Sequence, residues 1–173
     1  DRDVTGVQTC ALPISIGDMW AQISGLRTGQ KRLIEICGKY GTRTVDQAIE
    51  RLIQNSAEFS RSQVGQIPDG IYTASGMMDK DIMGNGPFPI QVKVTIEGDQ
   101  MYVDFTGSAP QTKSPINVAY DGLVSAIRSV FLACTDSSQN VNDGVFENLH
   151  IKAEKGSIFN AIRPAAEIGR AHV

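Results

Sequence analysis

The chain has 173 residues, of which 41% are hydrophobic and 20% are charged, and its formal net charge at pH 7 is −3. This length suffices for one ordinary domain with its own core, and the absence of clustered basic residues excludes the electrostatic footprint of a nucleic-acid-binding protein. No apolar run approaches the ~20 residues of a membrane span, so we expect a protein of the cytoplasm that binds neither nucleic acid nor membrane.

Both ends of the chain look unlike protein. Residues 4–14 resemble a translated adapter from a DNA-sequencing library, and residues 168–173 resemble the same adapter read from the other strand. If the last six residues are encoded as ATC GGA AGA GCA CAC GTC, the reverse complement, shifted by one base, encodes residues 9–14 but for its final base. A targeting peptide is the alternative, but the apolar run is short and no basic segment precedes it. We therefore expect residues 1–15 and 167–173 to be adapter-derived tails and residues 16–166 to be the one informative segment.

Two long helices are predicted first. Between Met19 and Tyr40, six of the seven positions spaced at alternating steps of four and three are apolar, with Gln30 as the exception, which indicates one face of a long helix. Asp18 suits the first turn of this helix, and Gly41 suits its end. Thr44 is a good N-cap for a second helix. Because only a short turn joins the two helices, we expect them to pack as an antiparallel hairpin.

The sequence period then changes from helical to two. After a turn at Pro68-Asp69-Gly70, strands are predicted at Ile71–Met78 and at Ile90–Ile96, with a loop rich in Gly, Pro and Asp between them. Gly98-Asp99 suits a tight hairpin turn, and the alternating residues 101–105 form the return strand.

A further helix is predicted at Tyr120–Ala133, followed by short strands at Leu149–Ala153 and Ile158–Phe159. The expected fold class is α+β: an N-terminal antiparallel helical hairpin, then a mainly antiparallel sheet with one further helix. We expect this arrangement to be a fragment of a larger domain.

Cysteine and histidine supply no metal centre in the informative segment. Cys37 and Cys134 are far apart and lack CxxC spacing, and the apolar stripe around Cys37 favours a buried packing thiol. With Cys10 and His172 assigned to the tails, His150 is the single histidine of the segment. We therefore predict no metal site and no cofactor within residues 16–166.

The run from Val103 to Gln111 begins as a strand and ends as a loop crowded with hydroxyl, amide and carboxylate groups. Enzymes often place site groups on a polar loop at the end of a rigid strand. Asp104 could hold a substrate or order the loop. The alternative is a solvated strand carboxylate, with Thr106 and Ser108 capping a turn.

Other polar residues remain open to two interpretations. Ser108 lacks the GxSxG context of an activated nucleophile. Asn117 could donate to a carbonyl or phosphate, or could hold the loop backbone. Arg27 could bind an anion through its planar guanidinium, or could be a solvated helix residue. No catalytic residue is assigned, and the candidate substrate-binding residues are Asp104, Thr106, Ser108, Gln111, Asn117 and Arg27.

Several motifs, in order along residues 16–166, resemble those of the hydantoinase B/oxoprolinase family. Residues 17–22, GDMWAQ, are similar to the family's GDLxAQ, and residues 103–111 are similar to its DFTGS-P-Q pattern. Residues 156–166 resemble its GSLLNP…PAA run. Two matches are imperfect: Leu26 replaces the Asn of an NRTG-like motif, and Val141 replaces the Pro of a PNxGxF segment that is most simply a turn.

The resemblance implies part of the B-type subunit of an ATP-dependent hydantoinase or 5-oxoprolinase, which opens cyclic amides by hydrolysis. It implies a hydantoinase A-type ATPase as a separate subunit or fused half, ATP and Mg²⁺ at that partner, and a small-molecule substrate. Two alternatives remain: a subunit of an acetone or acetophenone carboxylase, or a non-catalytic scaffold of such a complex. Carboxylase members hold a divalent metal in a region before this segment, so we expect residues 16–166 alone to be inactive.

Overall fold

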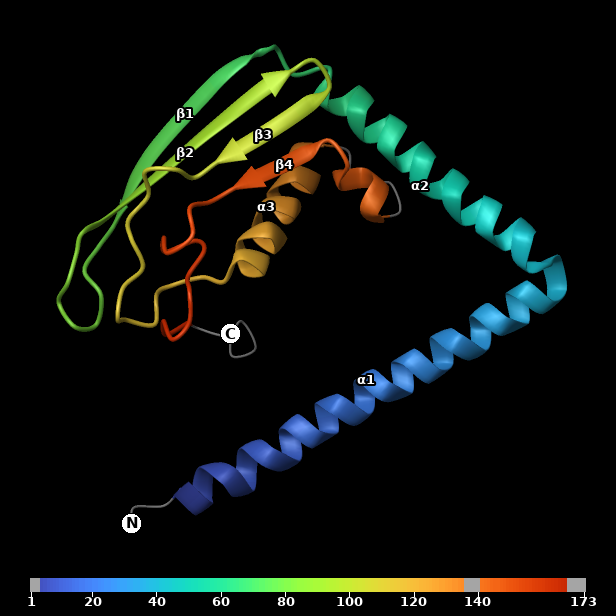
Figure 1. Ribbon diagram of the computed structural model, residues 1–173, viewed down its shortest axis with the longest axis horizontal. Helices are drawn as coiled ribbons and strands as arrows, with labels where there is room; N and C mark the ends of the chain where they lie inside the picture. The colour runs from blue at the N-terminus through green and yellow to red at the C-terminus, as the bar shows by residue number, and fades with distance from the viewer. Residues whose placement is uncertain (1–3, 136–140, 168–173) are drawn as a thin grey trace. The chain divides into compact units, whose positions relative to one another are not determined.

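The structure is an α+β fold in which two long helices precede a four-stranded sheet and a third helix (Figure 1). It is a computed structural model that describes the backbone of residues 4–135 and 141–167, and the side chains from residue 16 onward within those ranges. The chain divides into two compact units, residues 1–51 and residues 52–173. The α+β class and the mainly antiparallel sheet expected from the sequence are confirmed. Part of the predicted tails, residues 1–3 and 168–173, lies outside the described residues.

The first two helices meet at Gly41, as the sequence predicts. Helix α1 spans Val4–Tyr40 and helix α2 spans Thr42–Val64. Gly41 has a φ of +83°, and its N–H donates to the carbonyl of Cys37 at 2.8 Å, which is the bonding of a left-handed helix end that glycine tolerates best. The glycine therefore ends α1 and lets the chain start a new helix at once.

Two predicted helix boundaries are wrong. Helix α1 starts fourteen residues before Asp18, so Asp18 lies in its interior and not in its first turn. Helix α2 starts before Thr44, because the N–H of Val45 already donates to the carbonyl of Gly41 at 3.1 Å. Because this i to i−4 bond spans Thr44, Thr44 lies inside the first helical turn and is not the N-cap.

The large apolar side chains of α1 are mostly exposed, whereas α2 buries its C-terminal half. Leu26 and Ile34 of α1 are 75% and 63% exposed, and Leu52 of α2 is 57% exposed, but Val64 is fully buried. Cys37, which the apolar stripe predicts to be buried, is only partly buried, because so few side chains of α1 are covered. None of the described helices combines the length and apolarity needed to cross a membrane.

The sheet has the strand order β1-β2-β3-β4. The first three strands pair antiparallel, and β3 pairs with β4 parallel through a connection that contains α3. The elements of this unit are β1 (Gly70–Met78), β2 (Phe88–Glu97), β3 (Gln100–Asp104), α3 (Tyr120–Cys134), the 3-10 helix η1 (Asp143–Phe146) and β4 (Leu149–Lys152).

Two details of the C-terminal region differ from the sequence prediction. Ile158–Phe159 is a turn between isolated bridges at Ser157 and Asn160, and not a strand, because the N–H of Asn160 bonds back to the carbonyl of Ser157 at 3.1 Å. The predicted turn near Asn142 is the start of η1, whose N–H at Gly144 donates to the Asn142 side chain at 2.9 Å.

The core lies between α3 and one face of the sheet. Val103 and Phe105 pack with Leu123 of α3, and a second cluster joins Val64 of α2 to Phe131 of α3 and to β2. Burying each such side chain contributes about 1.5–3 kcal/mol. Because strand residues alternate between faces, this core leaves the polar residues of β2, β3 and β4 on the opposite face of the sheet.

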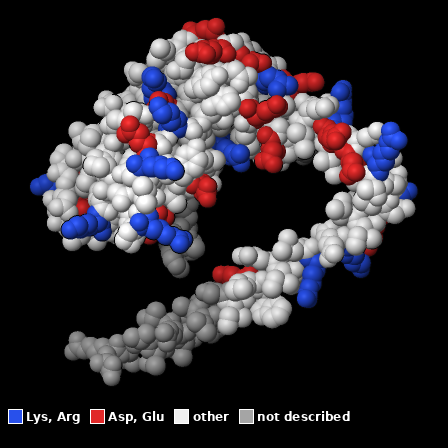
Figure 2. Space-filling view, viewed as in Figure 1, with Lys and Arg blue, Asp and Glu red and all other residues white. Residues whose placement is uncertain are grey.

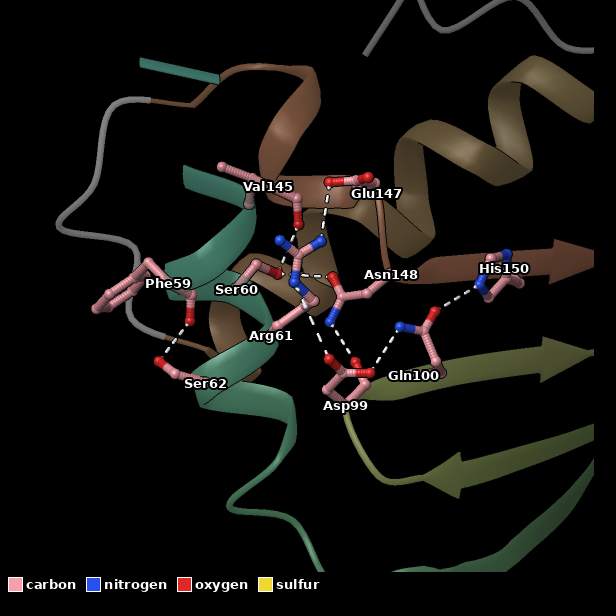
Figure 3. A network of polar contacts seen from close by, with 10 residues as sticks. All are labelled: Phe59, Ser60, Arg61, Ser62, Asp99, Gln100, Val145, Glu147, Asn148 and His150. Atoms are coloured by element: carbon pink, nitrogen blue, oxygen red, sulfur yellow. Dashed lines mark hydrogen bonds and ion pairs between the residues drawn. The ribbon is translucent and has the colours of Figure 1, made fainter. Parts of the chain in front are cut away.

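A polar network attaches the end of α2 to the β2–β3 hairpin and to η1 (Figure 3). The hydroxyl oxygen of Ser60, which is buried, lies 2.7 Å from the carbonyl of Val145 and 2.8 Å from Oδ1 of Asn148. Asn148 donates to the carbonyl of Asp99 at 2.7 Å. On the outside, Arg61 pairs with Glu147 at 3.1 Å. The network fixes the C-terminal end of α2 to the turn of the β2–β3 hairpin.

Candidate functional site

Three charged residues form a row across the polar face of the sheet. In the strand register, Lys93 of β2 lies opposite Asp104 of β3, and Asp104 lies opposite Lys152 of β4. Thr73 of β1 extends the row on the other side of Lys93. The sheet thus places one carboxylate between two ammonium groups, which come from three strands.

Asp104 is held by its own loop and by β4. Its Oδ1 accepts the N–H of Thr106 at 2.8 Å, and its Oδ2 accepts from Lys152 Nζ at 3.1 Å. Burial alone would raise the pKa of this carboxyl, but the hydrogen bonds from Thr106 and the charge of Lys152 outweigh it and lower the pKa to about 2. Asp104 is therefore an anion at neutral pH, and it neutralises Lys152.

A hollow of about 630 Å³ opens beside this row. Its lining combines three hydroxyls, one carboxamide, two ammonium groups and one carboxylate. The residues are Thr73, Ala74, Ser75, Gln91, Val92, Lys93, Asp104, Thr106 and Lys152. A smaller hollow of about 280 Å³ shares Lys93, Asp104 and Lys152 and extends to Tyr102 and His150. Such a set of groups can orient a small polar molecule by hydrogen bonds and charge.

Ser108 holds the loop against β2. Its hydroxyl accepts the N–H of Gln91 and donates to the carbonyl of the same residue, both at 3.0 Å. A Cβ on Gly107 would lie 2.7 Å from Oε1 of Gln91, and Gly107 has a φ of +90°, so only glycine fits this close approach without strain. Ser108 thus fixes the main chain of Gln91, and Gly107 leaves room for the Gln91 side chain, which lines the hollow.

Gln111 and Asn117 support backbone and do not line the hollow. Gln111 accepts the N–H of Ile162 at 2.7 Å. Asn117 is 2% exposed, and its amide bonds to both main-chain groups of Thr112 and to the carbonyl of Ala166 at 2.7 Å. An amide with this many buried main-chain partners orders the loop, which is the structural alternative considered for Asn117.

Of the other candidates, Thr106 lines the hollow and Arg27 does not. Arg27 is exposed on α1, in the unit of residues 1–51, and none of the described contacts of the hollow involves it. Ser108 does not pair with His150, because its hydroxyl bonds to the main chain of Gln91. The ring of His150 stacks on Tyr102 with centroids 4.7 Å apart and contacts Gln100 at 3.0 Å.

Five polar residues that line the hollow are not among the candidates chosen from the sequence: Thr73, Ser75, Gln91, Lys93 and Lys152. The alternation in β2 assigns Gln91 and Lys93 to the polar face, so the pattern could have identified both. It could not have placed Lys152, because the parallel pairing of β4 with β3 follows from tertiary structure. Within residues 16–135 and 141–167, no three His, Cys, Asp or Glu side chains gather as a metal site.

Charge is otherwise mixed on the visible surface. Figure 2 shows basic and acidic side chains interspersed, with no broad area of a single sign.

Comparison with known proteins gives a consistent result. The family model described as Hydantoinase B/oxoprolinase matches residues 11–173. A putative B-type subunit of a D-/L-hydantoinase from Pseudomonas sp. (strain NS671) is 38% identical over 166 residues, which cover 90% of this chain and 28% of that protein. The acetophenone carboxylase delta subunit of Aromatoleum aromaticum is 25% identical, over 81% of this chain and 21% of that protein.

The fold is also similar to a solved structure. The crystal structure of the ATP-dependent caprolactamase from Pseudomonas jessenii matches with a TM-score of 0.78 and 25% identity, over 89% of this chain and 27% of that chain. The present chain spans about a quarter of the length of these proteins.

Proposed function

Because this chain belongs to the hydantoinase B/oxoprolinase family, we propose that it is part of a B-type subunit of an ATP-dependent enzyme that opens cyclic amides by hydrolysis. The observation that carries the proposal is the similarity to the B-type hydantoinase relative along most of the chain. The similarity to an ATP-dependent caprolactamase supports the same reaction class. The expected partner is a hydantoinase A-type ATPase, either as a separate subunit or as a fused half, which holds ATP and Mg²⁺.

The hollow on the polar face is the proposed contribution of this chain to the site. Thr73, Ser75, Thr106 and Gln91 offer hydrogen bonds to a polar substrate. Asp104, with a pKa of about 2, stays ionised at neutral pH and cannot serve there as a general acid. Its proposed role is to order the loop and to balance charge beside the substrate.

The test uses a full-length family enzyme that carries these residues, in complex with its ATPase partner. We expect Asp104→Asn to lower kcat for ATP-dependent opening of hydantoin or 5-oxoproline by about tenfold or more, because the neutral amide no longer balances the charge of Lys152 beside the substrate, and a loss of about 1.4 kcal/mol of transition-state stabilisation has that effect. Ring opening and phosphate release would both be measured, and size-exclusion chromatography would check assembly. Asp121→Asn, at an exposed position of α3, is the matched control and should leave kcat unchanged.

The second candidate function is scaffolding of the subunit, which is favoured by the backbone-supporting roles of Ser108, Gln111 and Asn117. If Asp104→Asn and Ser108→Ala both leave kcat unchanged in an intact complex, this second function is correct. ATP-dependent carboxylation of a ketone with bicarbonate, in place of ring opening, would instead favour the carboxylase alternative suggested by the acetophenone carboxylase relative. We expect the 173-residue chain alone to turn over none of these substrates, and turnover by it would contradict the proposal.

A further inference from the structure

The charge balance of the hollow is uneven, and Lys93 carries the excess. Its lining holds two ammonium groups, Lys93 and Lys152, and one carboxylate, Asp104. Asp104 pairs with Lys152 at 3.1 Å, whereas Lys93 forms no ion pair within the described part of the chain. The hollow therefore has one unneutralised positive charge, and it lies on β2 next to the hydrogen-bonding side chains.

Hydrogen-bond donors surround this charge. Along β2, a neighbouring residue on the same face is Gln91, whose main chain is bonded to Ser108. Ser75 of β1 lies opposite Gln91 in the strand register, and Thr73 lies opposite Lys93. Hydroxyl and amide donors next to an ammonium group match the oxygens of a carboxylate or a phosphate, because charge-assisted hydrogen bonds are the strongest available on such a surface.

We propose that the hollow binds a small oxyanion, a carboxylate or phosphate group, through Lys93 and the neighbouring donors, and that Asp104 reduces its affinity by neutralising Lys152. The inference rests on the proposed function for the role of the hollow as a substrate site. It adds the class of group that the site recognises. Other charged groups on this face, Glu97 and His150, line the smaller hollow and not the larger one.

The row of charges makes opposite predictions for its members. Lys93→Gln should weaken anion binding by about tenfold, because it removes the uncompensated charge. Asp104→Asn should strengthen it by roughly threefold, because it leaves Lys152 without a counter-charge at a partly exposed site. Lys152→Gln should weaken anion binding, because the negative charge of Asp104 would then offset the positive charge of Lys93. Lys155→Gln, at an exposed turn after β4 and outside the lining, should change nothing.

The experiment is an NMR titration of the full 173-residue chain with inorganic phosphate and, separately, with acetate, at ionic strength held constant with sodium chloride. The expected result is saturable shifts of the amides of Gln91, Lys93 and Thr106, with the variant order given above. Preference for phosphate or for acetate identifies the kind of oxyanion. Circular dichroism confirms that each variant is folded, and if Asp104→Asn is unfolded, Lys93→Gln and Lys152→Gln decide the question.

Three results would overturn the inference. The first is that neither anion shifts the amide resonances of the hollow at about 50 mM, a concentration at which even a very weak site would fill. The second is that Lys93→Gln binds the anion as tightly as the parent chain. The third is that folded Asp104→Asn binds the anion more weakly, which would mean that Asp104 itself acts as a ligand. Because the titration needs no ATP and no turnover, its failure is separate from failure of the proposed hydrolysis.

Discussion

At the scale of single residues, the chain uses its polar side chains mainly to hold backbone segments together. The hydroxyl of Ser108 bonds to both main-chain groups of Gln91, as a neighbouring strand would. Asn117 connects the loop after Thr112 to the carbonyl of Ala166. Sequence reasoning identified these residues as unusual but could not separate binding from support, because both uses require the same donors and acceptors. The two uses are separated by which groups each side chain contacts in the fold, and those contacts depend on what the rest of the chain places around each residue.

Ser60 gives a direct measure of such support. Removing its hydroxyl leaves Asn148, which is buried, short of a partner (Figure 3). We expect Ser60→Ala to lower the free energy of unfolding by about 1–3 kcal/mol, the cost of a buried unsatisfied polar group. Ser62→Ala is the matched control, since its exposed hydroxyl bonds only to the carbonyl of Phe59, and it should cost less than ~0.5 kcal/mol. Urea unfolding of both variants checks this, and equal costs would contradict a special role for Ser60.

Asp104 should make stability depend on pH in a defined window. Its pKa is about 2 in the folded chain against an ordinary value of 3.8, so the folded state favours the ionised form. The stabilisation is fully present above pH 3.8 and is lost as the pH falls through about 2. We expect Asp104→Asn to be less stable than the parent chain at about pH 6, with the difference shrinking towards pH 2. Chemical denaturation at several pH values measures it, and a difference independent of pH would refute the assignment.

At the scale of elements, periodicity predicted most of the sheet. The alternation in β2 indicated both its existence and its polar face, and Gly98 indicated the hairpin. The predicted helix starts at Asp18 and Thr44 were wrong. A side chain suited to capping acts as a cap only where the backbone N–H groups of the first turn have no helical partner. Ile158–Phe159 is apolar enough for a strand, but local bonding between Ser157 and Asn160 closes a turn there.

Strand β1 has an element-scale property that the pattern did not reveal. Among the described residues it has a neighbour on one side only, it contains no charged residue and no proline, and Met77 is 61% exposed. Natural edge strands usually carry such residues against unwanted pairing. We expect Met77→Lys to reduce concentration-dependent self-association of the isolated chain, measured by light scattering. Met83→Lys, in the loop after β1 and similarly exposed at 65%, should have little effect. If both substitutions reduced self-association equally, the added charge and not the exposed edge of β1 would account for the effect.

At the scale of the whole molecule, the sequence predicted the α+β class and the family, because several motifs occur in one order over the segment. It could not place the hollow, since several strands contribute to it and one of them pairs parallel after a long connection. The adapter-like character of residues 1–15 and 167–173 stays a prediction. It can be checked by long-read sequencing of the source DNA across both junctions. A reading frame that continues upstream into a block rich in His and Asp would support it, and a genome that encodes residues 4–14 and 168–173 would contradict it.

The parallel pairing of β3 with β4 also has a kinetic consequence. The β1, β2 and β3 meander joins residues that are close in sequence, so its loops close at little entropic cost and early in folding. Lys152 reaches Asp104 only after the connection between them, a separation of 48 positions that includes α3, has been ordered. We therefore expect the charge row to be completed after the meander has formed, because Lys93 and Asp104 can face each other across β2 and β3 before Lys152 is in place.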